Sequence, residues 1–144
     1  MRRNYPEKPD KVYFMGTCLA DMLYAEAGLA GIRLLEREGV KVIYPREQTC
    51  CGQPAFNSGF QDEALEVVLH QINCFPKAYP IVVPSGSCGA MMVRHYPELF
   101  EGHPLEQKAI EFYSRILELS EFLHHVLKIS LKDQVVPVKV TWHT

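Results

Sequence analysis

Four cysteines are the residues of this chain whose type and spacing are best suited to chemistry. Two of them, Cys50 and Cys51, are adjacent in a loop that continues with Gly52. Adjacent cysteines pack poorly into a core, because their side chains leave the backbone in different directions, but they can present two thiolates to one ligand or one redox event. Cys18 and Cys88 occupy equivalent places elsewhere in the chain. The sequence therefore predicts a site built from these four thiols.

The elements that must position these cysteines are short apolar strands that alternate with amphipathic helices. Apolar, β-prone runs predict strands over residues 11–16, 40–45, 80–84 and 135–142. Apolar residues at helical spacing predict helices over residues 19–37, 60–75 and 90–96, and one long helix or two in sequence over residues 105–128. Strands that alternate with helices are typical of βαβ units. We therefore expect an α/β fold, a three-layer structure with a parallel sheet of about four strands.

The predicted topology brings the four cysteines to one edge of the sheet. Cys18 follows the first strand, Cys50 and Cys51 follow the second, and Cys88 follows the third. Ligands of open parallel sheets bind outside the carboxyl ends of the strands, where these loops meet. Each loop leads into a helix N-terminus, whose partial positive charge stabilises a thiolate or an anionic cluster. Gly52 lets the backbone approach a bound group closely.

Two other residues mark the limits of this site. Cys74 stands near the end of the helix predicted over residues 60–75, roughly 20 Å along the helix from the cysteine loop at ~1.5 Å per residue. It is therefore expected to be a packed thiol outside the site. His143 follows the last predicted strand, so it lies either at the same edge of the sheet or in a frayed terminus.

The thiols admit three kinds of chemistry. Zinc accepts four thiolates in a tetrahedron, but two adjacent ligands strain such a site, so a zinc-stabilised scaffold that binds partner subunits is one alternative. An iron–sulfur cluster has several metal corners and can accept adjacent thiolates on different irons. The third alternative is thiol–disulfide exchange at Cys50 and Cys51, acting as a strained vicinal pair.

Composition excludes several other classes of function. The 144 residues predict a flexible tail over residues 1–10 and a single domain over residues 11–144. A formal net charge of −2 without a basic run gives no reason to bind nucleic acid. The sequence has no apolar run long enough to span a bilayer and no apolar leader near its start, so a cytoplasmic, reducing location is expected. It also has no glycine-rich nucleotide motif.

The cysteine spacing resembles that of a known family, the cysteine-rich CCG domain. The order Cys18, then 31 residues, then Cys50-Cys51, then 33 residues that begin with Gly52, then Ser85-Gly86-Ser87-Cys88 is similar to the family signature. The domain occurs in heterodisulfide reductases and in the iron–sulfur subunit of glycolate oxidase. The segments 50–59, 84–88 and 118–123 are most similar to its lactate-utilization branch, and the resemblance covers about residues 11–143.

This resemblance implies a function in electron transfer. The ligands of an iron–sulfur cluster, of the 4Fe-4S type, would be Cys18, Cys50, Cys51 and Cys88. The module would belong to an oxidoreductase complex that converts L-lactate to pyruvate, and its partners would be a ferredoxin-like iron–sulfur subunit and a second CCG domain. The sequence carries no flavin or nicotinamide motif, so this module would pass electrons without performing the hydride step, and its catalytic residues are unknown.

The chain departs from the family in two respects. The family has a cysteine where this chain has Ser85, which either ligates the cluster as an alkoxide or caps the following helix. The family also has two CCG domains in one chain, and this sequence resembles the first of them.

Overall fold

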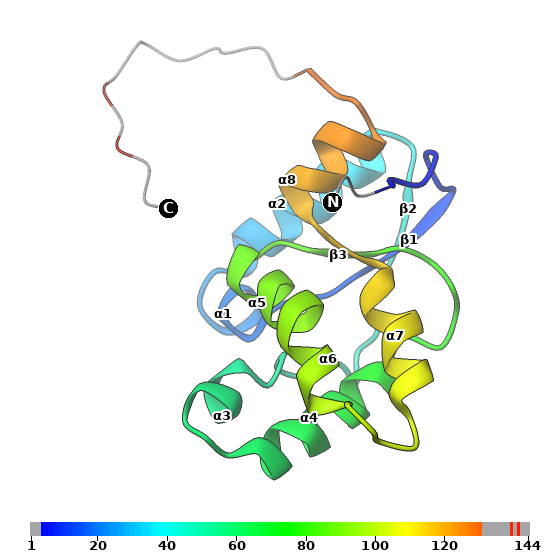
Figure 1. Ribbon diagram of the computed structural model, residues 1–144. Coiled ribbons are helices and arrows are strands. Elements are labelled where there is room, and N and C mark those ends of the chain that lie inside the picture. The colour runs from blue at the N-terminus through cyan, green and yellow to red at the C-terminus, as the bar shows by residue number, and fades with distance from the viewer. Residues whose placement is uncertain (1–3, 131–138, 140, 142–144) are drawn as a thin grey trace.

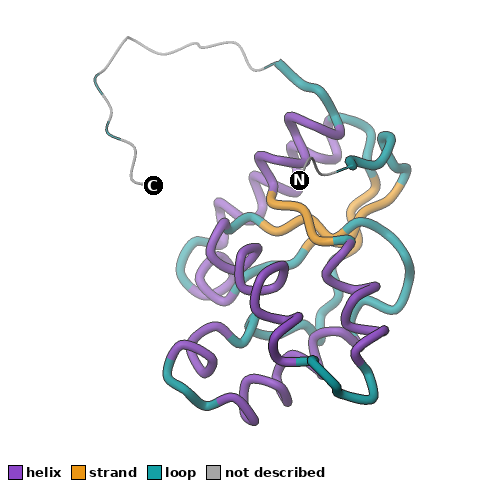
Figure 2. Tube along the Cα trace, in the orientation of Figure 1, coloured by secondary structure: helices purple, strands orange, loops and turns teal. Residues whose placement is uncertain are grey.

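Four parallel strands form the centre of the molecule. The computed structural model describes residues 4–130, 139 and 141. The sheet has the strand order β2-β1-β3-β4, with every neighbouring pair parallel (Figures 1 and 2). Its strands are β1 (Lys11–Phe14), β2 (Lys41–Ile43), β3 (Ile81–Val83) and β4 (Ile116–Glu118). The predicted α/β fold with a four-stranded parallel sheet is confirmed.

Helices cover both faces of this sheet (Figure 1). Between β1 and β2 the chain forms α1 (Cys18–Met22) and α2 (Ala25–Arg37), and between β2 and β3 it forms α3 (Gln53–Asn57) and α4 (Gln61–Asn73). Between β3 and β4 it forms α5 (Gly86–Ala90), a π-helical turn η1 (Met91–His95), α6 (Tyr96–Leu99) and α7 (Glu106–Ser114). After β4 follow α8 (Leu119–Glu121) and a second π-helical turn, η2 (Phe122–Val126).

The two faces of the sheet belong to two separate cores. Successive side chains of a strand point to opposite faces, so β1 contributes to both. Val12 and Phe14 pack in one core with Leu35 of α2, whereas Tyr13 and Met15 pack in the other, larger one. All four of these side chains are buried, as expected for a central strand covered on both faces.

The strand order also creates a crevice at the carboxyl edge of the sheet. The chain runs from β1 outward to β2, and then returns to place β3 on the other side of β1. The connections after β1 and β3 therefore leave in opposite directions, which is the topological switch point where open α/β sheets bind ligands. Cys18 follows β1 and Cys88 follows β3, so these two cysteines flank the switch point.

Of the two predictions for residues 105–128, one long helix or two in sequence, the single helix is wrong, and the two helical segments are separated by a strand. The structure breaks the helix after Ser114 and inserts β4, which pairs with β3 in the register Ile81 to Ile116. The apolar residues of this stretch satisfy a helical spacing, and a strand of three residues is too short to show its own period. Glu118 then starts α8 with a capping box, in which its side chain accepts from the backbone N–H of Glu121.

Arg115 is the residue that fixes the start of β4. Its guanidinium donates hydrogen bonds to the carbonyl groups of Phe75, Lys77 and Tyr79, which precede β3 in the chain. Its own carbonyl accepts from the backbone N–H of Ile81 at 2.9 Å. A five-donor guanidinium that satisfies three carbonyls holds the two strand starts side by side.

One further predicted helix differs from the structure, and one predicted strand falls outside the described residues. The helix predicted over residues 19–37 is interrupted between Met22 and Ala25, where the chain turns from α1 into α2. The strand predicted over residues 135–142 lies outside the described residues, apart from residues 139 and 141, which form no strand. The fourth strand of the described sheet is β4 instead.

Replacement of Arg115 by Met is predicted to destabilise the fold. The change removes the donor from three carbonyl groups, two of them in partly buried hydrogen bonds, and a hydrogen bond to a charged group contributes about 1.5–3 kcal/mol. The free energy of unfolding, measured by urea denaturation, should fall by about that amount or more. Arg33→Met, at an exposed position of α2, is the control and should stay within about 0.5 kcal/mol of the original protein. Equal losses in the two variants would contradict the anchoring role.

Candidate functional site

The structure places the four predicted cysteines after three successive strands. Cys18 is the first residue of α1, whose N-cap Thr17 accepts a hydrogen bond from the Ala20 N–H at 3.3 Å. Cys50 and Cys51 lie in the loop between β2 and α3, and Cys88 lies within α5, after β3. The sequence placed these residues at one edge of the sheet, and the order of the elements agrees with that placement.

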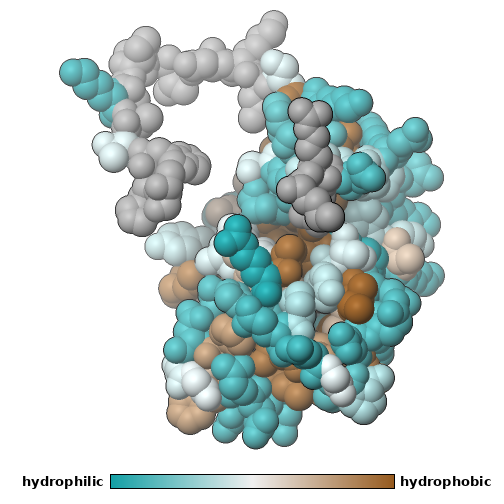
Figure 3. Space-filling model, in the orientation of Figure 1, coloured by the Kyte–Doolittle hydropathy of each residue, from teal (hydrophilic) through white to brown (hydrophobic). Residues whose placement is uncertain are grey.

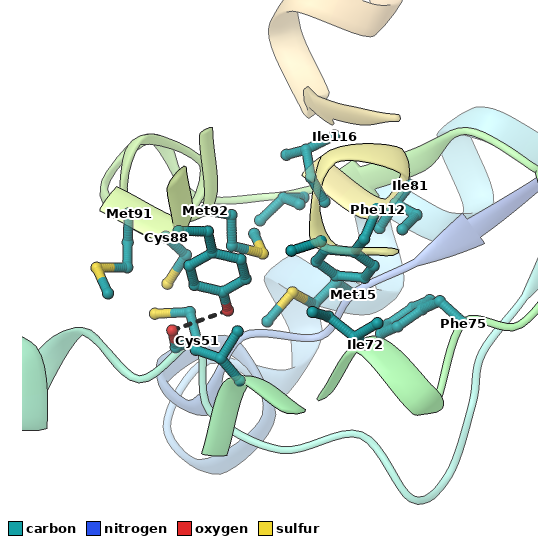
Figure 4. Packing of buried hydrophobic residues seen from close by; sticks show 14 of the residues in the cluster. Met15, Cys51, Ile72, Phe75, Ile81, Cys88, Met91, Met92, Phe112 and Ile116 are labelled. Carbon is teal, nitrogen blue, oxygen red and sulfur yellow. Dashed lines mark hydrogen bonds between the residues drawn. The ribbon is translucent and has the colours of Figure 1, made fainter. Parts of the chain in front are cut away.

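The four thiols form two pairs. The sulfur of Cys50 lies 3.9 Å from the sulfur of Cys18. Cys51 instead lies beside Cys88, the two thiols influence each other's pKa, and Figure 4 shows these side chains next to each other. The adjacent cysteines of the loop therefore have different partners, on two different strands. Among the described residues, no group of three or more His, Cys, Asp or Glu side chains has the geometry of a metal site.

The two pairs differ in their exposure. Cys51 and Cys88 are buried, with exposed fractions of 2% and 7%, and both belong to the larger core. Cys18 and Cys50 are only partly buried. They line a pocket of about 440 Å³ whose other walls include Asp21, Tyr44 and Arg46. One pair is thus reachable from solvent, and the other is enclosed by protein.

The buried pair is electrostatically polarised. The hydrogen bond from Cys51 lowers the pKa of Cys88 to about 6, with smaller contributions from the hydroxyls of Ser85 and Ser87, although burial opposes the shift. The same hydrogen bond, together with burial, raises the pKa of Cys51. Cys51 is therefore the donor and Cys88 the thiolate. Burial and the neighbouring Cys50 also raise the pKa of Cys18.

Ser85 caps the helix that carries Cys88. Its hydroxyl accepts a hydrogen bond from the Cys88 N–H at 3.5 Å and lies 3.2 Å from the hydroxyl of Ser87. Of the two roles that the sequence left open for Ser85, the structure shows the helix cap. The same hydroxyl acts on the Cys88 sulfur, so the serine also belongs to the surroundings of this thiol.

Gly52 shapes the loop directly after the paired cysteines. Its φ of +82° lies in the left-handed region, which a residue with a Cβ adopts only with strain. A Cβ atom at this position would also lie 3.3 Å from Val68 and 3.5 Å from the carbonyl of Ala64, both on α4. Gly52 therefore lets the cysteine loop turn into α3 while it lies close against α4.

Two buried polar side chains that the sequence analysis missed hold the cysteine loop. Gln71 of α4 accepts a hydrogen bond from the Thr49 N–H at 2.7 Å, and the hydroxyl of Tyr96 donates to the carbonyl of Cys51 at 3.0 Å (Figure 4). Both side chains are fully buried. Gln71 interrupts the apolar face of α4 next to Ile72, and a polar residue in an apolar stripe is the signal that could have revealed it.

The neighbouring cysteines also affect the pKa of Tyr96. Its pKa is raised well above the usual value, chiefly by burial and then by electrostatic interaction with the neighbouring cysteines, Cys51, Cys50 and Cys88. The phenol therefore stays protonated and remains a hydrogen-bond donor. On the opposite side of the loop, Nε2 of Gln71 is buried without a hydrogen-bond partner among the described residues.

Cys74 lies outside the two pairs. It is the C-cap residue of α4, and its sulfur lies 3.4 Å from the carbonyl and 3.6 Å from Nε2 of His70. Its role as a thiol without chemistry stays a prediction. His143 lies outside the described residues, so its proposed place at the edge of the sheet is not tested.

The fold and the paired thiols define a cysteine-rich α/β domain, and the comparisons with known proteins assign its family. Residues 12–93 match the family model of the CCG cysteine-rich domain. This match covers more than half of the chain, and the chain belongs to that family.

The similar proteins are longer than this chain. It is 44% identical over 135 residues to lactate utilization protein A of Geobacillus kaustophilus, which is 93% of this chain and 56% of the relative. It is 42% identical over 135 residues to the protein of the same name from Halalkalibacterium halodurans, which is 93% of this chain and 55% of that relative. The chain thus spans just over half the length of these relatives. No solved structure matches it.

The residues present fit a metal or cluster by their donor chemistry. Thiolates are the ligands that iron–sulfur clusters and many zinc sites use. Two thiolates on one tetrahedral metal, at a metal–sulfur distance of ~2.3 Å, lie roughly 3.8 Å apart, which is close to the separation of Cys18 and Cys50. Each pair alone supplies two donors, so a site that uses all four needs both pairs.

Titration of the metal-free protein should show one thiol whose pKa lies far below the usual value for cysteine. Because the pKa of Cys88 is lowered to about 6, its thiolate should be present at neutral pH and should be protonated as the pH falls through about 6. Ultraviolet thiolate absorbance followed against pH measures this step. Cys88→Ser should remove it, and Cys74→Ser should leave it in place. A step that persists in Cys88→Ser would contradict the assignment.

Replacement of Tyr96 by Phe tests the anchor of the loop. The change removes only the hydroxyl and leaves the buried Cys51 carbonyl unpaired, so the free energy of unfolding should fall by about 1–3 kcal/mol. Alkylation of Cys51, followed by peptide mass spectrometry, should become faster because its backbone is released. Tyr24→Phe, at an exposed tyrosine, is the matched control and should change neither quantity. Unchanged alkylation of Cys51 in Tyr96→Phe would show that the hydroxyl does not hold the loop.

Proposed function

We propose that this chain is an iron–sulfur electron-transfer module of a system that oxidises L-lactate to pyruvate. The observation that carries the proposal is that four cysteines from three βα loops lie as two neighbouring pairs at one edge of a parallel sheet. The substrate of the system is inferred from the relatives, which are named lactate utilization proteins. Cys18, Cys50, Cys51 and Cys88 are the proposed ligands of a 4Fe-4S-type cluster, and Ser85 and Gly52 shape its surroundings.

The pairing of the thiols supports a cluster over a single zinc ion. Cys50 lies beside Cys18 and Cys51 lies beside Cys88, so neighbouring residues of the chain face different partners. A cluster offers several irons to such ligands, whereas one tetrahedral zinc would have to draw all four sulfurs to a single point. When bound, an iron–sulfur cluster supplies a centre that accepts and releases one electron.

The protein's own residues would prepare this site. The hydroxyls of Ser85 and Ser87 help to lower the pKa of Cys88, and polar groups around a ligating sulfur tune the potential of such centres. Tyr96 stays protonated and holds the loop. Burial of Cys51 and Cys88 excludes water from one side of the site, while the partly buried Cys18 and Cys50 leave the other side open to a redox partner.

The proposed module works within an assembly. We infer a ferredoxin-like iron–sulfur subunit and a second CCG domain as partners, a cytoplasmic location, and a hydride step performed by another subunit. No helix in the described part of the chain is long and apolar enough to cross a bilayer.

A thiol–disulfide function is the second candidate, and the contact between Cys18 and Cys50 favours it. Their sulfurs lie 3.9 Å apart in a pocket open to solvent. In this reaction the two thiols would reduce an external disulfide: a bond forms between the sulfurs of Cys18 and Cys50, the substrate's S–S bond breaks, and the two protons and two electrons pass to the released thiols. The vicinal Cys50–Cys51 disulfide is less favoured, since these two residues have separate partners.

Anaerobic reconstitution with iron and sulfide tests the cluster. The protein should gain visible charge-transfer absorption, an electron paramagnetic resonance signal after reduction, and about four iron atoms per chain if the cluster is of the 4Fe-4S type. Cys50→Ser and Cys51→Ser should each lose most of this iron. Cys74→Ser is the matched control, since it changes a thiol outside both pairs, and should retain it.

Three outcomes would contradict the proposal of an iron–sulfur cluster. If Cys50→Ser and Cys51→Ser retained as much iron as the original protein, these two cysteines would not be ligands of the cluster. Zinc at one atom per chain, without iron, in protein purified without oxygen would support the zinc-stabilised scaffold. A disulfide between Cys18 and Cys50 that forms on incubation with oxidised glutathione, in protein that binds no metal, would support the thiol–disulfide function.

A further inference from the structure

We propose that the exposed apolar surface beside the cysteine pocket is the docking surface for the part of the family chain that lies outside the matched region. The proposal rests on the proposed function, because it names the partner that covers the same site. This surface is called the α1–α2 surface, and it consists of Leu19, Met22, Leu23, Tyr24, Leu29 and Tyr44.

The α1–α2 surface is more apolar and more exposed than a solvated helix pair requires. Met22, Leu23 and Tyr24 are 78%, 68% and 65% exposed, and every residue from 21 to 27 is exposed. An aromatic side chain presents on the order of 150–250 Å², so the two tyrosines and four aliphatic side chains of this surface, each between 38% and 78% exposed, together expose several hundred Å². That is comparable to the largest apolar patch of a typical monomer, about 300–600 Å², and to the roughly 800 Å² that each partner contributes to a specific interface.

The exposed side chains are concentrated in this one part of the molecule. Of the large hydrophobic side chains that are exposed in the described residues, six belong to the α1–α2 surface. The other four are spread over separate places in the chain: Phe60, Val93, Leu105 and Ile110. In Figure 3, apolar side chains interrupt the hydrophilic surface at the edge of the molecule where α1 lies in Figure 1. Single exposed hydrophobic residues are ordinary, whereas a contiguous set marks an interaction site.

The α1–α2 surface is continuous with the candidate site. An apolar pocket of about 410 Å³, lined by Leu29 and Ile32 of α2, shares Gly16, Asp21 and Tyr44 with the cysteine pocket. The hydroxyl of Tyr44 donates to the Asp21 carboxylate at 3.1 Å, and this hydrogen bond stands between the two pockets. Anything seated on this surface therefore also borders the pocket that contains Cys18 and Cys50.

Gly16 allows this arrangement. A Cβ atom at Gly16 would lie 2.3 Å from the Tyr44 hydroxyl, so only glycine lets the ring lie against the end of β1. The wall between the two pockets thus depends on a close approach that the backbone is built to permit. The apolar pocket supplies room for a side chain of the partner, as buried anchors do at specific interfaces.

The relatives contain a further segment that we infer to be the occupant of the α1–α2 surface. The matched residues make up 56% of the Geobacillus kaustophilus relative, so about 44% of that chain has no counterpart here. That remaining polypeptide must pack somewhere against the matched domain or remain separate from it. The α1–α2 surface gathers most of the exposed large hydrophobic side chains of the described residues and borders the partly exposed thiols, so it is the place where docking would both bury apolar area and cover the site.

Hydrogen–deuterium exchange tests the docking surface. The first sample is this chain alone, and the second is this chain fused to the unmatched part of the Geobacillus kaustophilus relative. Amide exchange over residues 19–29 should slow by about tenfold or more in the fusion, because docking suppresses local opening. Residues 106–114 of α7 provide the internal control and should exchange at the same rate in both samples.

Matched variants separate the surface from a general effect. Met22→Glu combined with Leu23→Glu should abolish the protection in the fusion, and Leu105→Glu combined with Ile110→Glu should retain it. Because the fused part can fail to fold, the intact Geobacillus kaustophilus relative is measured as well. Its segment aligned with residues 19–29 should show protection that its own Glu double variant loses.

Several results would overturn the docking proposal. Unchanged exchange over residues 19–29 in both the fusion and the intact relative would exclude docking there, as would protection confined to α7. A dimer of this chain alone, detected by analytical ultracentrifugation and dissociated by the Met22 and Leu23 double variant, would make a second copy the occupant. Iron content of the same samples keeps the two proposals apart: a fusion that loads iron without protection refutes only the docking, and one that is protected without loading iron refutes only the cluster.

Discussion

The hydrogen bonds that hold the Thr49–Cys51 backbone are the constraint on which the rest of the site depends. Gln71 of α4 accepts from the Thr49 N–H, and Tyr96 of α6 donates to the Cys51 carbonyl. Both of these side chains are fully buried, and the hydrogen bond from Tyr96 to Cys51 is buried as well. Because the loop is held on both sides, Cys50 faces Cys18 and Cys51 faces Cys88. Without these anchors, two adjacent thiols in a turn would have no fixed partners.

The sheet topology explains why such a loop can reach two partners. The order β2-β1-β3-β4 places the loop after β2 at one side and the helix after β3 at the other, with β1 between them. The connections diverge at the switch point, so the carboxyl edge is open there. Arg115 supports the same arrangement from the opposite end of the sheet, where it holds the start of β4 against the segment before β3. Contacts between residues far apart in the sequence thus hold both ends of the sheet.

The asymmetry between the two thiol pairs links the site to its surroundings. The buried pair is polarised, with Cys88 the thiolate and Cys51 the donor, whereas the other pair opens into a pocket that borders the α1–α2 surface. An enclosed side lowers the local dielectric and strengthens electrostatic interactions at Cys51 and Cys88. An open side is where electrons or a disulfide substrate would enter. A partner seated on the α1–α2 surface would decide how much of that open side remains.

The sequence by itself determined the fold class, the loops that carry the thiols and the family. Apolar periodicity identified β1, β2 and β3, and the spacing of the four cysteines matched the CCG family before any geometry was known. Local patterns could not reveal β4, because its three residues lie within a longer stretch whose apolar spacing fits a helix and their strand state depends on pairing with β3. Nor could they show that Gln71 and Tyr96 hold the loop or that the thiols pair as they do, since those contacts join residues 22 to 45 positions apart. Only the tertiary structure decides which distant side chains meet, because burial and hydrogen bonding select partners that sequence spacing does not encode.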